Sequence, residues 1–192
     1  MKIVIFGTGG VGGYFGGKLA LAGNDVTFIA RDKHLEAIEK NGLAIKSIQG
    51  DFTIHPAKVT SDPKSIGKAD LVILAVKSWQ LKEIGDDLKA LCDEKTIFLP
   101  LENGISAPGV LTEFVSPNLV LGGLCKIFSF IEAPGIICHS GYPPSITFGE
   151  LNYTRSERIQ KIREILDQAG IENHIPENIV AKIDDATTLK SQ

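Results

Sequence analysis

A glycine-rich segment near the amino terminus is the part of this sequence that most directly indicates a chemistry. Residues 7–12 read Gly-Thr-Gly-Gly-Val-Gly, which is the spacing G-x-G-x-x-G, and they follow an apolar, β-branched run at Lys2–Phe6. In this pattern the first glycine permits a tight turn, the second lets a pyrophosphate approach the backbone, and the third lets helix and strand pack closely. The sequence therefore predicts a dinucleotide-binding loop formed by Gly7, Thr8, Gly9, Gly10, Val11 and Gly12.

The end of the second strand decides which nicotinamide dinucleotide such a loop prefers. A carboxylate there binds the ribose 2′-hydroxyl of NAD(H), whereas a cation accommodates the 2′-phosphate of NADP(H). Here the strand ends in Ala30-Arg31, and a guanidinium can hold a phosphate through two hydrogen bonds. Arg31 therefore favours NADPH, and Lys33 could add a second phosphate contact. Asp32 would weaken or reverse this preference if its carboxylate, rather than the Arg31 guanidinium, faced the ribose.

The elements that position these residues follow from the hydrophobic pattern. A strand at Lys2–Phe6, a helix over residues 11–22 and a strand over residues 26–30 form a right-handed βαβ unit. A short helix is predicted at 34–40, followed by a small antiparallel pair at 43–48 and 51–54 that we expect to be peripheral. Six- and five-residue apolar runs at 71–76 and 96–100 are typical of buried parallel strands, with an amphipathic helix over 80–91 between them.

The second half of the chain has a different pattern of predicted elements. Four short strands, over residues 119–124, 126–131, 136–139 and 145–148, are separated by glycine and proline. Ser156 is predicted to cap a helix that runs to Ala169, and an edge strand at 172–175 and a last helix from Glu177 follow. The fold class is therefore α/β, a Rossmann-type doubly wound sheet that is mostly parallel, with antiparallel strands at its C-terminal edge.

Composition narrows the class of partner. The chain has 192 residues, of which 43% are hydrophobic, and this is enough for one ordinary α/β domain. A formal net charge of −3 gives no electrostatic case for nucleic acid or an anionic membrane. No apolar stretch approaches the roughly 20 residues that span a bilayer, and the start does not resemble a signal peptide. We therefore expect a cytoplasmic protein with a small-molecule partner.

Cysteines and histidines indicate no further site. The cysteines, Cys92, Cys125 and Cys138, are odd in number and widely spaced, which favours reduced thiols over a disulfide framework or a zinc site. The four histidines, at positions 34, 55, 139 and 174, lack metal-ligand spacing. The sequence therefore predicts no metal, and it assigns no histidine a chemical role.

Two further segments lie where strand ends meet the expected crevice. These are Val76-Lys77-Ser78-Trp79-Gln80 and Leu101-Glu102-Asn103-Gly104. Together with the glycine loop and Arg31 they resemble the ketopantoate reductase family, whose members reduce 2-dehydropantoate with NADPH on the route to pantothenate and coenzyme A. The resemblance covers nearly the whole chain, including Gly122-Gly123 and the stretch over 134–149.

This resemblance implies particular roles for three residues. Lys77 and Asn103 would border the nicotinamide and the substrate, and Lys182 matches the family's catalytic lysine at the start of a hinge helix. Reduction of a ketone builds negative charge on oxygen, which an ammonium group can stabilise and protonate. From the residues alone, the alternative for the two lysines is an exposed surface charge, and for Asn103 it is the turn residue of an Asn-Gly pair. Trp79 is interpreted as a packing residue.

The resemblance also implies a domain organisation. Residues 1–176 would form the NADP-binding domain, and residues 177–192 would begin the hinge helix that leads to a C-terminal helical domain, which this chain lacks together with its substrate ligands. Two alternatives to the reductase therefore stay open. One is a non-catalytic NADP(H)-binding module that senses cofactor or pairs with another chain, with a homodimer as one form. The other is a reductase of a different 2-keto acid in the same superfamily.

Overall fold

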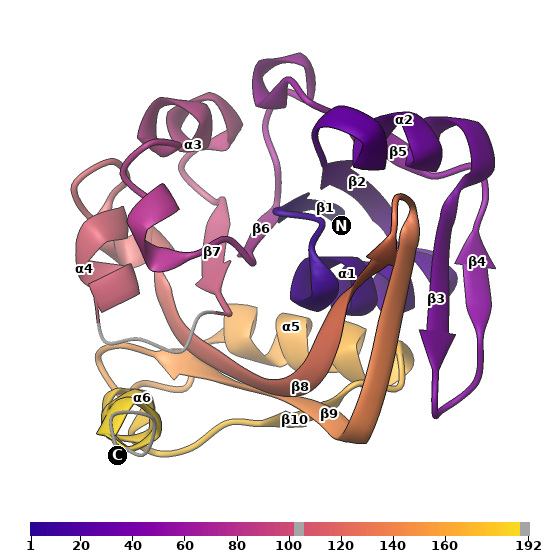
Figure 1. The fold of residues 1–192 in the computed structure, drawn as a ribbon. Coiled ribbons are helices and arrows are strands. Elements are labelled where there is room, and N and C mark those ends of the chain that lie inside the picture. The colour runs from indigo at the N-terminus through magenta and orange to yellow at the C-terminus, as the bar shows by residue number, and fades with distance from the viewer. Residues whose placement is uncertain (102–105, 189–192) are drawn as a thin grey trace.

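A parallel five-stranded sheet forms the first half of the molecule (Figure 1). The computed structural model describes residues 1–101 and 106–188. The sheet has the order β5-β2-β1-β6-β7, and all its pairs are parallel. Its strands are β1 (Lys2–Phe6), β2 (Asp25–Ile29), β5 (Lys58–Thr60), β6 (Leu71–Leu74) and β7 (Ile97–Pro100). The predicted Rossmann-type α/β class is therefore confirmed, although β5 was not anticipated.

A second, mixed sheet continues from the β7 edge. Its order is β10-β9-β3-β4, and β8 pairs with β9. An isolated parallel bridge between Phe98 and Val120 links β7 to the start of β8. The predicted antiparallel pair at 43–54 forms as β3 and β4, but it is not peripheral, because β3 also pairs with β9. The strands are β3 (Leu43–Ser47), β4 (Phe52–Ile54), β8 (Leu121–Ala133), β9 (Ile136–Glu150) and β10 (Glu172–His174).

The four short strands expected beyond residue 119 are in fact the two long strands of one hairpin, β8 and β9. Lys126 pairs with Ser145, and Phe128 pairs with Ser140, so residues 141–144 lie in an irregular stretch of β9. Prolines are tolerated where no ladder hydrogen bond is needed. The glycine and prolines of this stretch therefore interrupt the register without ending the strand.

Six helices are described. Ser156 accepts a hydrogen bond from the Ile159 N–H, as its predicted capping role requires, and Gly170 follows the helix with a φ of +63°. The helix expected from Gln80 begins only at Gly85, because Ser78–Gln80 forms a separate 3₁₀ turn. The helices are α1 (Gly10–Leu21), α2 (Asp32–Asn41), α3 (Gly85–Leu91), α4 (Ser106–Leu111), α5 (Glu157–Gln168) and α6 (Ile179–Thr188).

Helix α1 is packed between the two sheets, and in Figure 1 the β8–β9 hairpin crosses it. A Cβ atom on Gly16 would lie 2.6 Å from Ile5 Cγ1 in β1, whereas one on Gly13 would lie 2.7 Å from Ile137 Cγ1 in β9. Glycine costs a helix about 1 kcal/mol per residue relative to alanine. Because α1 contains several glycines, its stability depends on being packed from both sides.

Residues of β1 alternate between two cores, as the period of a strand requires. Ile3 and Ile5 belong to the core that includes α1, the second sheet and α5. Val4 and Phe6 belong to the core on the opposite face, with α3 and α4. This two-sided burial is why the strand reads as a continuous apolar run.

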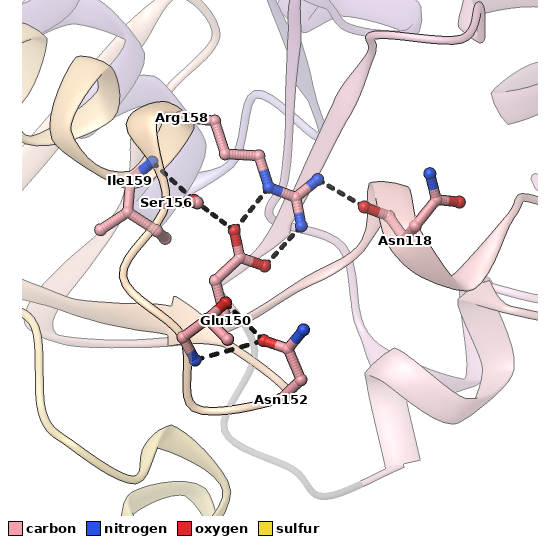
Figure 2. Close-up of polar contacts among 7 residues, drawn as sticks. Asn118, Glu150, Asn152, Ser156, Arg158 and Ile159 are labelled. Carbon is pink, nitrogen blue, oxygen red and sulfur yellow. Dashed lines mark hydrogen bonds and ion pairs between the residues drawn. The ribbon is translucent and has the colours of Figure 1, made fainter.

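A buried ion pair fixes the end of β9 (Figure 2). Glu150 is 7% exposed and accepts a 2.7 Å hydrogen bond from Arg158 Nε and another from the Ser156 hydroxyl. Arg158 also donates to the Asn118 carbonyl, ahead of β8. Burial by itself raises the pKa of Glu150, but the hydrogen bonds from Arg158 and Ser156 and the Arg158 charge outweigh it and hold the pKa below its ordinary value. The pair therefore joins α5 to the end of β9 and to the segment that leads into β8.

We expect Gly16→Ala to destabilise the fold by about 1–2 kcal/mol, because overpacking outweighs the better helix propensity of alanine. The added methyl would lie 2.6 Å from Ile5 Cγ1 and 2.7 Å from Phe28 Cε1. The matched control is Gly109→Ala in α4, where a Cβ would meet nothing within 4 Å. Urea unfolding of both variants is the measurement, and equal midpoints would contradict the packing of α1.

Candidate functional site

A cleft of about 410 Å³ opens at the carboxyl ends of β1, β2 and β6. The strand order reverses at β1, with β2 on one side and β6 on the other. Crevices at such switch points are where open α/β sheets bind ligands. The lining comes from the loop after β1, the start of α2, the segment after β6, and Ile131 of β8.

The loop after β1 has the geometry that its glycines predict. Gly7 has a φ of +98°, and a Cβ there would lie 2.9 Å from the Ala75 carbonyl oxygen. A Cβ on Gly12 would lie 2.1 Å from the Gly7 carbonyl oxygen, so only glycine lets the helix approach the loop this closely. At Gly9, by contrast, a Cβ would meet nothing within 4 Å. Gly7, Thr8 and Gly9 line the cleft, while Gly10, Val11 and Gly12 form the first turn of α1.

The first turn of α1 gives this end of the cleft an anion-binding character. The first N–H groups of any α-helix have no partner within the helix, and they carry the positive end of its dipole. Thr8 holds the approach to this turn, because both its N–H and its hydroxyl donate to the Ile29 carbonyl, at 3.1 and 2.8 Å. The loop is thereby fixed to the end of β2.

Arg31 lies where the sequence placed it, at the end of β2. It caps α2 in an extended conformation, its side chain is exposed, and it lines the cleft. Asp32 is not among the described residues that line the cleft, and its φ of 51° sets its backbone apart from that of Arg31. Of these two residues, Arg31 is therefore the one that borders the cleft.

His34 is the cleft residue that the sequence did not single out. Its Nε2 lies 2.8 Å from the Thr8 carbonyl oxygen, and its Nδ1 accepts a 2.9 Å hydrogen bond from the Gly135 N–H. Burial lowers the pKa of this imidazole, while the bond to the Thr8 carbonyl opposes the shift. Its two partners lie 26 and 101 residues away in the sequence, so no local pattern marked this histidine.

Lys77 lies on the opposite side of the cleft, after β6. Its N–H donates to Gln80 Oε1 at 3.0 Å, and its carbonyl accepts from the Gln80 N–H at 2.8 Å. These reciprocal bonds explain the Lys-x-x-Gln spacing as a small turn that keeps Lys77 at the cleft. Trp79 in the same turn is 70% exposed, so the interpretation of it as a packing residue was wrong. Glu83, which the sequence did not single out, also lines the cleft.

The remaining two predicted residues are not brought into this cleft. Lys182 is exposed on α6, between Ile179 and Ile183, which are buried, and it is not among the described residues lining the cleft. Asn103 lies outside the described residues. The structure therefore gathers the glycine loop, Arg31 and Lys77, and leaves Lys182 on a separate element.

Other chemistries find little support in the described part of the chain. Residues 1–101 and 106–188 contain no group of three or more His, Cys, Asp or Glu side chains that could hold a metal ion. Within the same ranges, no helix is long and apolar enough to cross a bilayer. None of the three cysteines forms a disulfide.

Comparison with known families agrees with this geometry. The family model of ketopantoate reductase PanE/ApbA matches residues 3–153, which include every described residue that lines the cleft. The chain belongs to the ketopantoate reductase family. The family resemblance drawn from the glycine loop, Arg31 and the Lys77 segment is thereby confirmed.

Individual proteins and solved structures are similar to this chain over most of its length. An uncharacterized oxidoreductase of Bacillus subtilis, YkpB, is 36% identical over 186 residues, covering 95% of this chain and 61% of that protein. The crystal structure of 2-dehydropantoate 2-reductase from Geobacter metallireducens has a TM-score of 0.90 at 30% identity, over 99% of this chain and 61% of the other. The ternary structure of D-mandelate dehydrogenase with NADH and anilino(oxo)acetate has a TM-score of 0.86 at 27% identity, covering 95% and 59%. This chain spans about three fifths of the length of the curated relatives that it matches.

Proposed function

We propose that this ketopantoate reductase family member reduces 2-dehydropantoate, a 2-keto acid, to pantoate with NADPH as the reductant. The observation that carries the proposal is the cleft at the switch point, where the glycine loop, Arg31 and Lys77 converge. We also propose the domain organisation that the sequence suggested. Residues 1–176 bind the cofactor, and the helix that begins beyond them is a hinge.

The described residues fit a dinucleotide. The open space at Gly9 admits a pyrophosphate, and the amides that begin α1 supply its hydrogen bonds. Arg31, exposed at the cleft, supplies a planar cation for a 2′-phosphate. When bound, NADPH supplies the hydride of the reduction. The proposal of NADPH rests on Arg31, since the D-mandelate dehydrogenase structure is one with NADH.

The roles of the chain's own side chains follow from the charges of the reaction. The substrate is an anion whose ketone oxygen gains negative charge during reduction. In the proposal, the Lys182 ammonium stabilises that oxygen and donates the proton to it. Lys77, held at the cleft by Gln80, and Asn103 orient the substrate carbonyl and the cofactor amide.

A second candidate function is the reduction of a different 2-keto acid. It is favoured by the likeness to D-mandelate dehydrogenase, whose structure holds anilino(oxo)acetate. The two candidates share the cofactor cleft and the same charge development on the ketone. They differ in the side chain of the acid that is accepted, so turnover with 2-dehydropantoate and with an aromatic 2-keto acid separates them.

We expect Gly9→Val to abolish NADPH binding while leaving the fold intact. A Cβ at Gly9 would meet no other segment of the chain within 4 Å, so we expect the fold to accept the branched side chain, which would fill the space that the pyrophosphate needs. Gly16→Ala is the matched control, because its Cβ would collide with Ile5 Cγ1 away from the residues that line the cleft and lower stability instead. Calorimetric titration with NADPH and thermal unfolding measure the two effects. NADPH binding retained by a folded Gly9→Val variant would contradict the cofactor site.

The wild-type chain is expected to bind NADPH more tightly than NADH. Arg31→Ala should weaken NADPH binding by about 1.5–3 kcal/mol, the typical value of a charge-assisted hydrogen bond, and leave NADH binding nearly unchanged. Titration of both reduced cofactors against both proteins is the measurement. A preference for NADH in the wild type would show that Asp32 and not Arg31 sets the choice.

Lys182→Ala should lower the rate constant for reduction of 2-dehydropantoate by about 100-fold or more, with little change in NADPH affinity. Single-turnover oxidation of bound NADPH, with the protein in excess over keto acid, measures the rate even where release is slow. Lys161→Ala, at an exposed position of α5, is the control for loss of one surface charge. Near-normal reduction by the Lys182 variant would show that this lysine is a surface residue.

A further inference from the structure

The His34 imidazole connects two segments that are distant in the sequence. Gly135, in the turn between β8 and β9, donates its N–H to Nδ1 at 2.9 Å. A nitrogen that accepts cannot carry a hydrogen, so the neutral ring has its hydrogen on Nε2. That hydrogen is donated to the Thr8 carbonyl oxygen, 2.8 Å away. The ring therefore accepts a hydrogen bond from the β8–β9 turn and donates one to the glycine loop, and it joins the two.

The orientation of the Thr8 carbonyl also determines the orientation of the Gly9 N–H. A peptide unit is planar and trans, so its C=O and the following N–H point in opposite directions. Holding the Thr8 carbonyl toward α2 therefore also sets the direction of the Gly9 N–H. Gly9 is the loop residue with open space beside it, and it caps the amino terminus of α1.

Gly135, the hydrogen-bond donor to His34, is itself held by contacts with two elements. Gly135 has a φ of +77°, and a Cβ there would lie 3.1 Å from the Ala37 Cβ of α2. Its carbonyl accepts a 2.9 Å hydrogen bond from the Ala44 N–H of β3. The turn thus rests on both α2 and β3, and His34 transmits this fixed position to the loop. The same hairpin supplies Ile131 to the cleft.

We propose that His34 is a positioning residue for cofactor binding, which holds the Thr8–Gly9 peptide in the orientation that receives a pyrophosphate. The inference rests on the proposed binding of a nicotinamide dinucleotide. His34 acts through the loop and not on the nicotinamide or the adenosine phosphate. Its effect is therefore the same for every ligand that shares the pyrophosphate.

Two conservative variants separate the two hydrogen bonds of the ring. In His34→Gln the side-chain amide can still donate from the position of Nε2, whereas in His34→Asn the oxygen can still accept at the position of Nδ1. We expect His34→Asn to weaken NADPH and NADH binding by the same factor, about 5- to 20-fold, because the bond to the Thr8 carbonyl is lost. His34→Gln should stay within about twofold of the wild type. His34→Phe, which has neither group, should be at least as weak as His34→Asn.

The measurements are calorimetric titrations with NADPH and with NADH, together with urea unfolding of each ligand-free protein. Arg31→Ala is the matched control, since it should weaken NADPH alone. Equal affinities in His34→Gln and His34→Asn, or weakening confined to NADPH, would overturn the positioning role. Weakening that only follows a lower unfolding midpoint would overturn it as well. Failure of the wild type to bind either cofactor would instead overturn the proposed function, and this inference with it.

Discussion

The close approach of α1 to two sheets is the constraint on which the rest of this structure depends. Gly12 and Gly16 bring the helix against β1, and one residue further along, Gly13 and Gly17 bring it against the second sheet. Larger side chains at either pair would separate the helix from one sheet. Because α1 follows β1 directly, the packing of α1 between the sheets also holds the amino terminus of this helix at the carboxyl ends of the strands. The same backbone contacts thus hold the core together and aim the first-turn amides at the cleft.

The cleft is shaped by hydrogen bonds between neutral side chains and the backbone more than by charged side chains. Thr8 is held by the end of β2, and His34 and Gly135 extend this connection to the β8–β9 turn. Arg31 and Lys77 then stand on opposite sides of a preformed loop. The second sheet therefore contributes to the cleft, although the sequence suggested that its first strands were peripheral. The buried Glu150–Arg158 pair secures the other end of that sheet to α5.

The sequence was most informative where the determining contacts are local. The β1–α1–β2 unit, the roles of Gly7 and Gly12 and the Ser156 cap all depend on residues within a few positions of each other, so their spacing could be interpreted directly. The continuous β8–β9 hairpin was divided wrongly because its glycines and prolines break the register without ending the pairing. His34 was missed for a related reason. Its partner Gly135 lies 101 residues away, and no local pattern reports such a contact.

The two-sided packing of α1 also has a consequence for synthesis on the ribosome. The face of this helix that meets Ile137 remains uncovered until the β8–β9 hairpin has emerged, more than a hundred residues after α1 itself. A glycine-rich helix with one bare face has little stability of its own. We therefore expect the first βαβ unit of the nascent chain to stay loosely formed until the β8–β9 hairpin is available. Folding of this domain is therefore completed through contacts of high sequence separation, which are slow to form.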